Sequence, residues 1–244
     1  MRVIVTETFA QACEIAAGVI ADVVRKKPDA RLGLATGSTA QGVYPYLVEA
    51  YREGKVDFSR VNTVNLDEYV GLAADHPQSY RRFMDENLFD RINIDKTRTV
   101  VAKGTGDLEA NIREFRLSLG QKPIDVQLLG IGVDGHVGFN EPGRVLCDGA
   151  HVEKLDQSTI DANARFFSSR EEVPTQAISM GMGDILRARK LLLLATGESK
   201  AEAMKGLLLN ETLDAQNPAT LIKTHPDVTV ILDKALAKSV GYVY

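Results

Sequence analysis

Residues 128–143 read LLGIGVDGHVGFNEPG, an apolar run that ends in a glycine-rich loop. The segment that precedes the loop, Val126 to Gly130, is expected to form a buried strand. Three ionisable residues, Asp134, His136 and Glu141, follow within eight positions. Loops that follow strands are where α/β proteins usually place their chemistry. The stretch therefore predicts a strand that carries a catalytic or binding loop at its end.

On both sides of this stretch, short apolar runs alternate with segments of helical spacing. The run at 190–196, KLLLLAT, is apolar enough for the centre of a parallel sheet. The alternation predicts an α/β fold of right-handed βαβ units on a mostly parallel sheet. We expect strands at 2–5, 31–35, 61–66, 97–102, 126–130, 177–180, 190–196 and 229–232, and helices at 8–27, 39–53, 79–88, 108–119, 183–188, 199–209 and from 234.

The domain organisation follows from what separates these segments. No Pro/Ser-rich linker divides the 244 residues, so residues 1–244 are expected to form a single domain. The stretch from His151 to Pro174 is polar and weakly patterned, which is typical of a flap over a site.

Composition excludes several classes of partner. The chain has 29 basic and 33 acidic residues, a net charge of −4, which leaves no electrostatic footprint for nucleic acid or an acidic membrane. No apolar run approaches the roughly 18 residues of a membrane span, and the N-terminus lacks a signal sequence. The two isolated cysteines, Cys13 and Cys147, form neither a disulfide framework nor a zinc site. We expect a cytoplasmic protein.

The glycine-rich loop is open to three chemical interpretations. Residues 130–135 are a literal GxGxxG, but the following HVGFNEPG is unsuited to the helix that a dinucleotide fingerprint must open. Asp134, His136 and Glu141, with Asp67, could instead ligate a transition metal, although no second histidine lies nearby. Finally, His136 could transfer a proton to or from a sugar oxygen near neutral pH, with carboxylates that favour its protonated form.

Two further strand ends carry candidate site residues. Asp67 follows an expected buried strand and could move a carbon-bound proton, or could simply form a turn. The turn Thr36-Gly37-Ser38-Thr39 can cradle a phosphate, although its hydroxyl groups would also cap a helix. A related ATG sequence at 195–197 leads to Lys200 at an expected helix start, where a cation is unfavourable unless an anion offsets it.

These motifs together resemble the glucosamine-6-phosphate deaminase family. The resemblance runs from residue 32 to about 203, in the family's order, and DEYVGL combined with DGHVGFNEP is its most specific part. The segments that carry it are LGLATGSTAQGVY, VNLDEYVGL, LLGIGVDGHVGFNEPG, NARFF, ATGESKAEA and, near the C-terminus, HPDVTVILD.

The resemblance implies a Rossmann-like α/β fold without a dinucleotide, an open, mostly parallel sheet with helices on both faces. It also implies an activity without a cofactor or metal: glucosamine 6-phosphate and water give fructose 6-phosphate and ammonia. It implies that His136 assists ring opening, with Asp134 and Glu141 orienting it, and that Asp67 transfers the C2 proton. The substrate phosphate would be held by residues 36–39 together with two cations. These phosphate-binding residues are Thr36, Gly37, Ser38, Thr39, Arg165 and Lys200. Residues 155–174 correspond to the family's mobile lid.

The chain departs from the allosteric hexamers of that family. Those members are longer at the C-terminus and use paired cations after the NEP loop, where this chain has His151 and Glu153. We therefore expect a non-allosteric monomer or small homo-oligomer that acts on an amino-sugar phosphate. A 6-phosphogluconolactonase and a non-catalytic sugar-phosphate sensor remain alternatives from the sequence, as does a preference for the galactosamine epimer.

Overall fold

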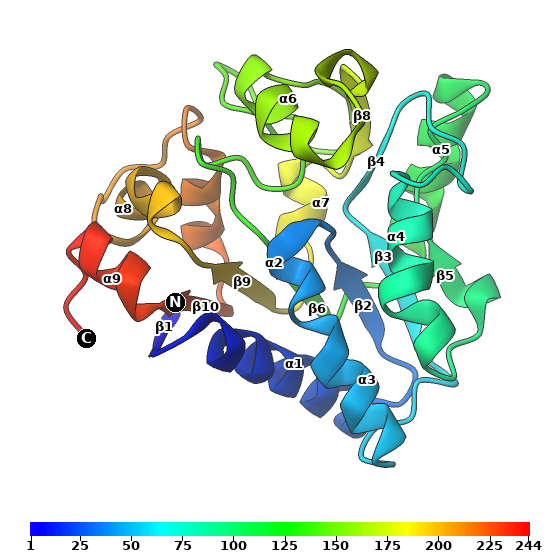
Figure 1. The fold of residues 1–244 in the computed structure, drawn as a ribbon, viewed down its shortest axis with the longest axis horizontal. Helices are drawn as coiled ribbons and strands as arrows, with labels where there is room; N and C mark the ends of the chain where they lie inside the picture. The colour runs from blue at the N-terminus through cyan, green and yellow to red at the C-terminus, as the bar shows by residue number, and fades with distance from the viewer.

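The computed structural model describes all 244 residues and places two sheets side by side (Figure 1). The larger sheet has seven strands, all parallel, in the order β1-β10-β9-β6-β2-β3-β5. Its strands are β1 (Arg2–Thr6), β2 (Arg31–Leu34), β3 (Asn62–Asn65), β5 (Thr99–Val100), β6 (Val126–Leu129), β9 (Leu191–Ala195) and β10 (Val228–Asp233). The expected mostly parallel α/β sheet is confirmed.

Helices surround this sheet and complete the α/β architecture (Figure 1). Helix α1 packs on β9 and β10 and also against α3, while α8 packs against α9. The α-helices are α1 (Phe9–Lys26), α2 (Gly37–Gln41), α3 (Tyr44–Arg52), α4 (Tyr80–Asn87), α5 (Leu108–Gln121), α6 (Gln157–Asn163), α7 (Met182–Leu186), α8 (Ala201–Leu208) and α9 (Lys234–Val240). None of them is long and apolar enough to cross a membrane.

The strands at the centre of the sheet are its most apolar. All five residues of β9 are buried, because β6 and β10 flank it and helices cover it. Strand β2, on the other side of β6, contains Gly33, at which a Cβ would lie 1.9 Å from the side-chain oxygen of Gln127 on β6. This close approach explains the glycine within the strand. The loops after β2, β3, β6 and β9 all leave from the carboxyl edge of the sheet, where α/β proteins bind ligands.

A second, three-stranded antiparallel sheet stands at that edge, in the order β4-β8-β7. Its strands are β4 (Asp67–Tyr69), β7 (His151–Lys154) and β8 (Gln176–Ser179). Only Leu66 separates Asp67, the first residue of β4, from the end of β3, so the chain passes almost directly from the large sheet to the small one. The small sheet thereby carries Asp67 next to the edge at which the loop after β6 emerges.

The structure corrects two local expectations. The helix expected at 39–53 is two helices, α2 and α3, because Pro45 has no N–H with which to continue the helical ladder from α2. The stretch from His151 is not wholly a flap, since its first four residues form β7. Val152 is the only apolar residue of that strand, so its sequence shows no strand pattern.

The segment at 155–174 lies between β7 and β8 of the small sheet. It contains α6 and two short 3-10 turns, Ala164–Phe166 and Arg170–Glu172. A small apolar cluster joins it to the small sheet and to the loop after β6: Tyr69, Phe139, Leu155, Ile160, Val173 and Ala177. This cluster is separate from the main core, so the segment makes its apolar contacts with β4, β8 and the loop after β6.

Candidate active site

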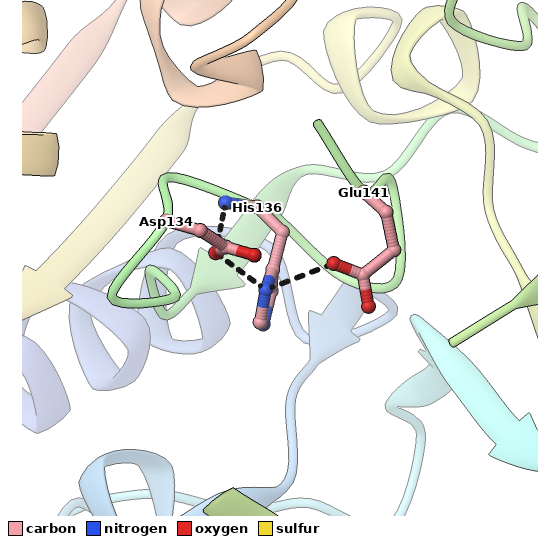
Figure 2. Close-up of side chains that lie close together, drawn as sticks. All are labelled: Asp134, His136 and Glu141. Atoms are coloured by element: carbon pink, nitrogen blue, oxygen red, sulfur yellow. Dashed lines mark hydrogen bonds and ion pairs between the residues drawn. The ribbon is translucent and has the colours of Figure 1, made fainter. Parts of the chain in front are cut away.

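In the loop after β6, the carboxylates of Asp134 and Glu141 both contact the imidazole of His136 (Figure 2). Nδ1 of His136 lies 2.8 Å from Oδ1 of Asp134 and 3.4 Å from Oε2 of Glu141. The backbone N–H of His136 also donates to Asp134 Oδ1, at 3.1 Å. Side-chain exposure is only 21% for His136 and 7% for Glu141, so little water screens these contacts.

This arrangement favours the charged form of His136. Burial lowers the pKa of the imidazole, but contact with Asp134 and Glu141 opposes that effect and raises the pKa to about 9. For Asp134, burial has the opposite sign and raises the pKa of the carboxyl. The neighbouring imidazolium outweighs this effect and lowers the pKa to about 2. At neutral pH the site therefore contains an imidazolium held by ionised carboxylate.

Glycines give the loop the compactness that these contacts require. A Cβ at Gly132 would lie 2.3 Å from His136 Nδ1 and 2.4 Å from Asp134 Oδ1, inside the contact itself. Gly135 has a φ of +92°, a conformation that other residues rarely adopt. The loop does not open a helix, as expected, so the GxGxxG residues form a tight turn and not the helix start of a dinucleotide fingerprint.

A C-terminal segment braces the loop from behind. Gly135 O accepts from Ala219 N–H at 2.9 Å, and Gly143 N–H donates to Ala215 O at 3.1 Å. The Gln216 side chain adds a bond to Gly143 O, at 2.8 Å. Both ends of the loop are thus fixed to one short segment, and the sequence of that segment shows no sign of this role.

Asp67 faces the same cleft from β4. It is 6% exposed, and burial is the main cause that raises the pKa of its carboxyl to about 8; adjacent Glu68 raises it further and His136 lowers it. Glu68 itself is buried and accepts three backbone N–H bonds, from Tyr69, Tyr80 and Arg81. A carboxyl whose neutral form is favoured near pH 7 can act as an acid and, once ionised, as a strong base.

The cleft joins Asp67 and His136 to the turn after β2. Gly37 in that turn has a φ of +85°, and Gly197 after β9 has a φ of +88°, so the glycine of each related ATG sequence has a positive φ of similar size. The residues that line the cleft are Ala35, Thr36, Gly37, Ser38, Thr39, Leu66, Asp67, Tyr80, Gly130, Ile131, Gly132, His136, Gly138, Phe139, Asn163, Arg165 and Phe166. All four residues of the expected phosphate turn are among them.

Two cations lie on the side of the cleft beneath α6. Arg165 lines both the main cleft and a neighbouring hollow, and Lys200 lines the hollow only. Burial lowers the pKa of Lys200, Asp134 raises it, and the nearby Arg165 lowers it. A half-buried lysine beside an arginine is electrostatically unfavourable, and an anion between them would relieve the repulsion.

Comparison with known proteins places this chain in a family. A family model for glucosamine-6-phosphate isomerases and 6-phosphogluconolactonases matches residues 5–231. The chain belongs to this family. A glucosamine-6-phosphate deaminase of Clostridium perfringens (strain 13) is 46% identical over 243 residues, 98% of this chain and 99% of the relative. A deaminase of Clostridium tetani is 49% identical over 240 residues, 98% and 99% of the two chains.

Solved structures of the glucosamine-6-phosphate isomerase/6-phosphogluconolactonase family agree with the fold. One, described as a monomeric glucosamine-6-phosphate deaminase, superposes with a TM-score of 0.94 at 42% identity and covers 98% of this chain and all of its own. A 6-phosphogluconolactonase from Trypanosoma brucei has a TM-score of 0.76 at 18% identity, with 98% of each chain covered. The second likeness is one of fold alone.

Within this family member, the structure brings most of the sequence-predicted residues together. Asp67, His136, Arg165 and the turn at 36–39 line one cleft, and Asp134 and Glu141 support His136. Lys200 lies one hollow away. Sequence reasoning missed the aromatic residues of the cleft. Tyr80 stacks on Phe139 with ring centroids 6.2 Å apart, and nothing in the local pattern around Tyr80 marks it as a site residue.

The three loop residues also form a set that a metal ion could use. Their ligand atoms lie within 4.8 Å of one another, and mixed imidazole and carboxylate donors suit a transition metal. A proton on Nδ1 satisfies the same two carboxylates. The two interpretations differ in what occupies the position between the imidazole and the carboxylates, a proton or a metal ion.

Proposed function

We propose that this protein catalyses the isomerising deamination of glucosamine 6-phosphate, with water, to fructose 6-phosphate and ammonia. The observation that carries the proposal is the pairing, in one cleft, of a buried carboxyl on β4 with an imidazolium on the loop after β6. Aldose–ketose isomerisation needs a base for a carbon-bound proton and an acid for a ring oxygen. The names of relatives at 46–49% identity support the same activity.

Ring opening is assigned to His136. Its imidazolium donates a proton to the ring oxygen as the bond from C1 to that oxygen breaks, and the C1 hydroxyl loses its proton to give the aldehyde. Asp134 and Glu141 hold the imidazole through Nδ1, which leaves Nε2 free to face the sugar. The carboxylates also stabilise the positive charge before transfer.

Isomerisation and loss of ammonia follow at C2. The ionised Asp67 removes the C2 proton, the electron pair forms a C1–C2 double bond, and the aldehyde oxygen gains a proton, which gives an enolamine. Asp67 then returns the proton to C1, and C2 becomes an imine. Water adds to this imine and ammonia leaves, so that C2 ends as the ketone of fructose 6-phosphate.

The phosphate is assigned to the turn at 36–39 together with Arg165 and Lys200. The turn offers backbone N–H groups and hydroxyls, Arg165 can grip two phosphate oxygens, and Lys200 supplies a second positive charge. Residues 155–174 are proposed to be a lid within a single-domain chain. Closure of the lid would bring Arg165 onto the phosphate and exclude bulk water from the imine.

Neither alternative function is supported by a specific observation. The lactonase relatives share the fold at 18–20% identity, far below the deaminases at 42–49%. A sugar-phosphate sensor would have no use for a carboxyl of raised pKa beside the sugar carbons. The cleft gives no reason to prefer the glucosamine over the galactosamine epimer.

The role of Asp67 is tested by ammonia release in heavy water. The wild-type protein is expected to release ammonia from glucosamine 6-phosphate and to incorporate solvent deuterium into the hexose. Asp67→Asn, which keeps the shape but removes the base, is expected to lower kcat by at least about 100-fold. A variant with near-normal turnover would contradict the assignment, and a wild-type protein that releases no ammonia would contradict the proposed function.

The pH dependence of kcat/KM follows from the two shifted groups. Asp67 must be ionised, so activity is expected to fall as pH drops below about 8. His136 must be protonated, so activity is expected to fall again as pH rises above about 9. The profile is therefore bell-shaped with a maximum between these values.

His136→Gln is the matched variant for this profile. It is expected to slow turnover far more than it weakens binding and to remove the alkaline limb, while the acidic limb from Asp67 remains. Full activity at pH 6 in the wild-type protein would show that the base is not a carboxyl of raised pKa.

We further propose a non-allosteric monomer. His151 Nε2 contacts Glu153 Oε2 at 2.9 Å, so at the two positions where the allosteric members carry paired cations this chain has a histidine and a carboxylate in contact. Sedimentation should give the mass of one chain, and rate against substrate concentration should be hyperbolic. N-acetylglucosamine 6-phosphate should leave the shape of that curve unchanged. A sigmoidal curve that this compound makes hyperbolic would refute the proposal.

A further inference from the structure

Asp67 and His136 reach the cleft from two different segments of the chain, so the distance between them depends on contacts that join these segments. Asp67 stands on β4, whereas His136 stands on a loop without regular secondary structure. We propose that Ser179, the last residue of β8, is the positioning residue that holds the two together. The inference rests on the proposed function, because it concerns the same proton transfers.

On the side of the base, Ser179 lies directly opposite Asp67. The two are register partners in the antiparallel pairing of β4 with β8. The next residue, Met180, donates its N–H to Leu66 O at 2.8 Å, which fixes the residue that precedes Asp67. The end of β8 therefore sets where the backbone of the base lies.

On the side of the acid, the Ser179 side chain binds the loop itself. Its Oγ accepts the N–H of Phe139, three residues after His136, at 3.0 Å and donates to Met180 O at 3.1 Å. Asn140 adds a second tie, since its Nδ2 donates to Met180 O at 2.9 Å and to Val137 O at 2.8 Å. The loop is thus bonded to the same two residues that hold Asp67.

Gly138 shows how closely the two halves approach at this point. A Cβ built on Gly138 would lie 3.1 Å from Ser179 Oγ and 3.6 Å from Asp67 Oδ2. The loop backbone therefore passes beside the hydroxyl of Ser179 and the carboxylate of Asp67 at once. Ser179 is fully buried, so no water can replace its hydroxyl without rearrangement of the loop.

The contact between Ser179 and the loop matters for the rate, because proton transfer depends on the distance between the reacting groups. A displacement of a reacting group by about 1 Å can cost on the order of 100-fold in rate. Without the Ser179 hydroxyl, the buried N–H of Phe139 loses its partner and the loop is free to shift away from β8. Such a shift would separate the ring-opening group from the base and leave the phosphate turn, on another strand, untouched.

The test compares Ser179→Ala with the wild-type protein in steady-state assays of ammonia release, with protiated substrate and with substrate deuterated at C2. For Ser179→Ala, kcat is expected to fall about 10- to 100-fold. KM should change by no more than about twofold, because binding is retained. The isotope effect on kcat should increase, because transfer of the C2 proton becomes slower.

Two matched variants separate positioning from general stability. Ser179→Thr keeps the hydroxyl and should retain most of kcat. Thr6→Val removes another buried hydroxyl with two backbone bonds, at the end of the edge strand β1, and should leave kcat and the isotope effect unchanged. If Ser179→Ala does not fold, Ser179→Cys, with a weaker acceptor of greater size, takes its place with the same expectation.

Wild-type kcat and isotope effect in the folded Ser179→Ala or Ser179→Cys protein would overturn the inference while leaving the proposed function intact. A loss that appears only in KM would also overturn it, because it would place Ser179 in binding. A wild-type protein without turnover would contradict the proposed function, and this inference with it.

Discussion

Nδ1 of His136 lies between two carboxylates in a place that water barely reaches, and the charge of that imidazole decides how the site works. A neutral imidazole would leave Asp134 and Glu141 as two poorly solvated negative charges a few ångströms apart. The positive charge of the imidazolium offsets these two negative charges. The loop therefore stabilises a proton on His136 and places this acid at the carboxyl edge of the large sheet. Neighbouring strands carry the base and the phosphate turn to the same edge.

The pKa values of the two reacting groups are both raised, but by different causes. Burial and Glu68 disfavour the charge on Asp67, whereas neighbouring carboxylates favour the charge on His136. Both groups therefore hold a proton more tightly than usual, and the sugar meets a ready acid and a carboxyl that becomes a strong base once it ionises. The small sheet brings the two groups into one cleft, because the chain leaves the main sheet after β3 and enters β4, which carries Asp67 next to the loop after β6.

Much of this could be predicted from sequence because local patterns encode it. Apolar runs of four or five residues, such as β9, identify the parallel sheet, and the glycines around Asp134, His136 and Glu141 identify a loop too irregular for a helix. The small sheet could not be predicted, because β4 and β7 have three and four residues and are held by pairing with β8 instead of by their own composition. Tyr80, Ser179 and the brace at 215–219 were missed for the same reason: each acts through a contact with residues distant in the chain.

The protonation state of His136 is the central claim, and nitrogen NMR of the protein labelled with ¹⁵N-histidine measures it directly. The signals of His136 are identified as those absent from His136→Gln among the four histidines. At pH 8 both ring nitrogens of His136 should carry protons, and the residue should titrate near 9. A neutral ring at pH 8, with a pKa at or below the ordinary value of about 6.5, would contradict the account.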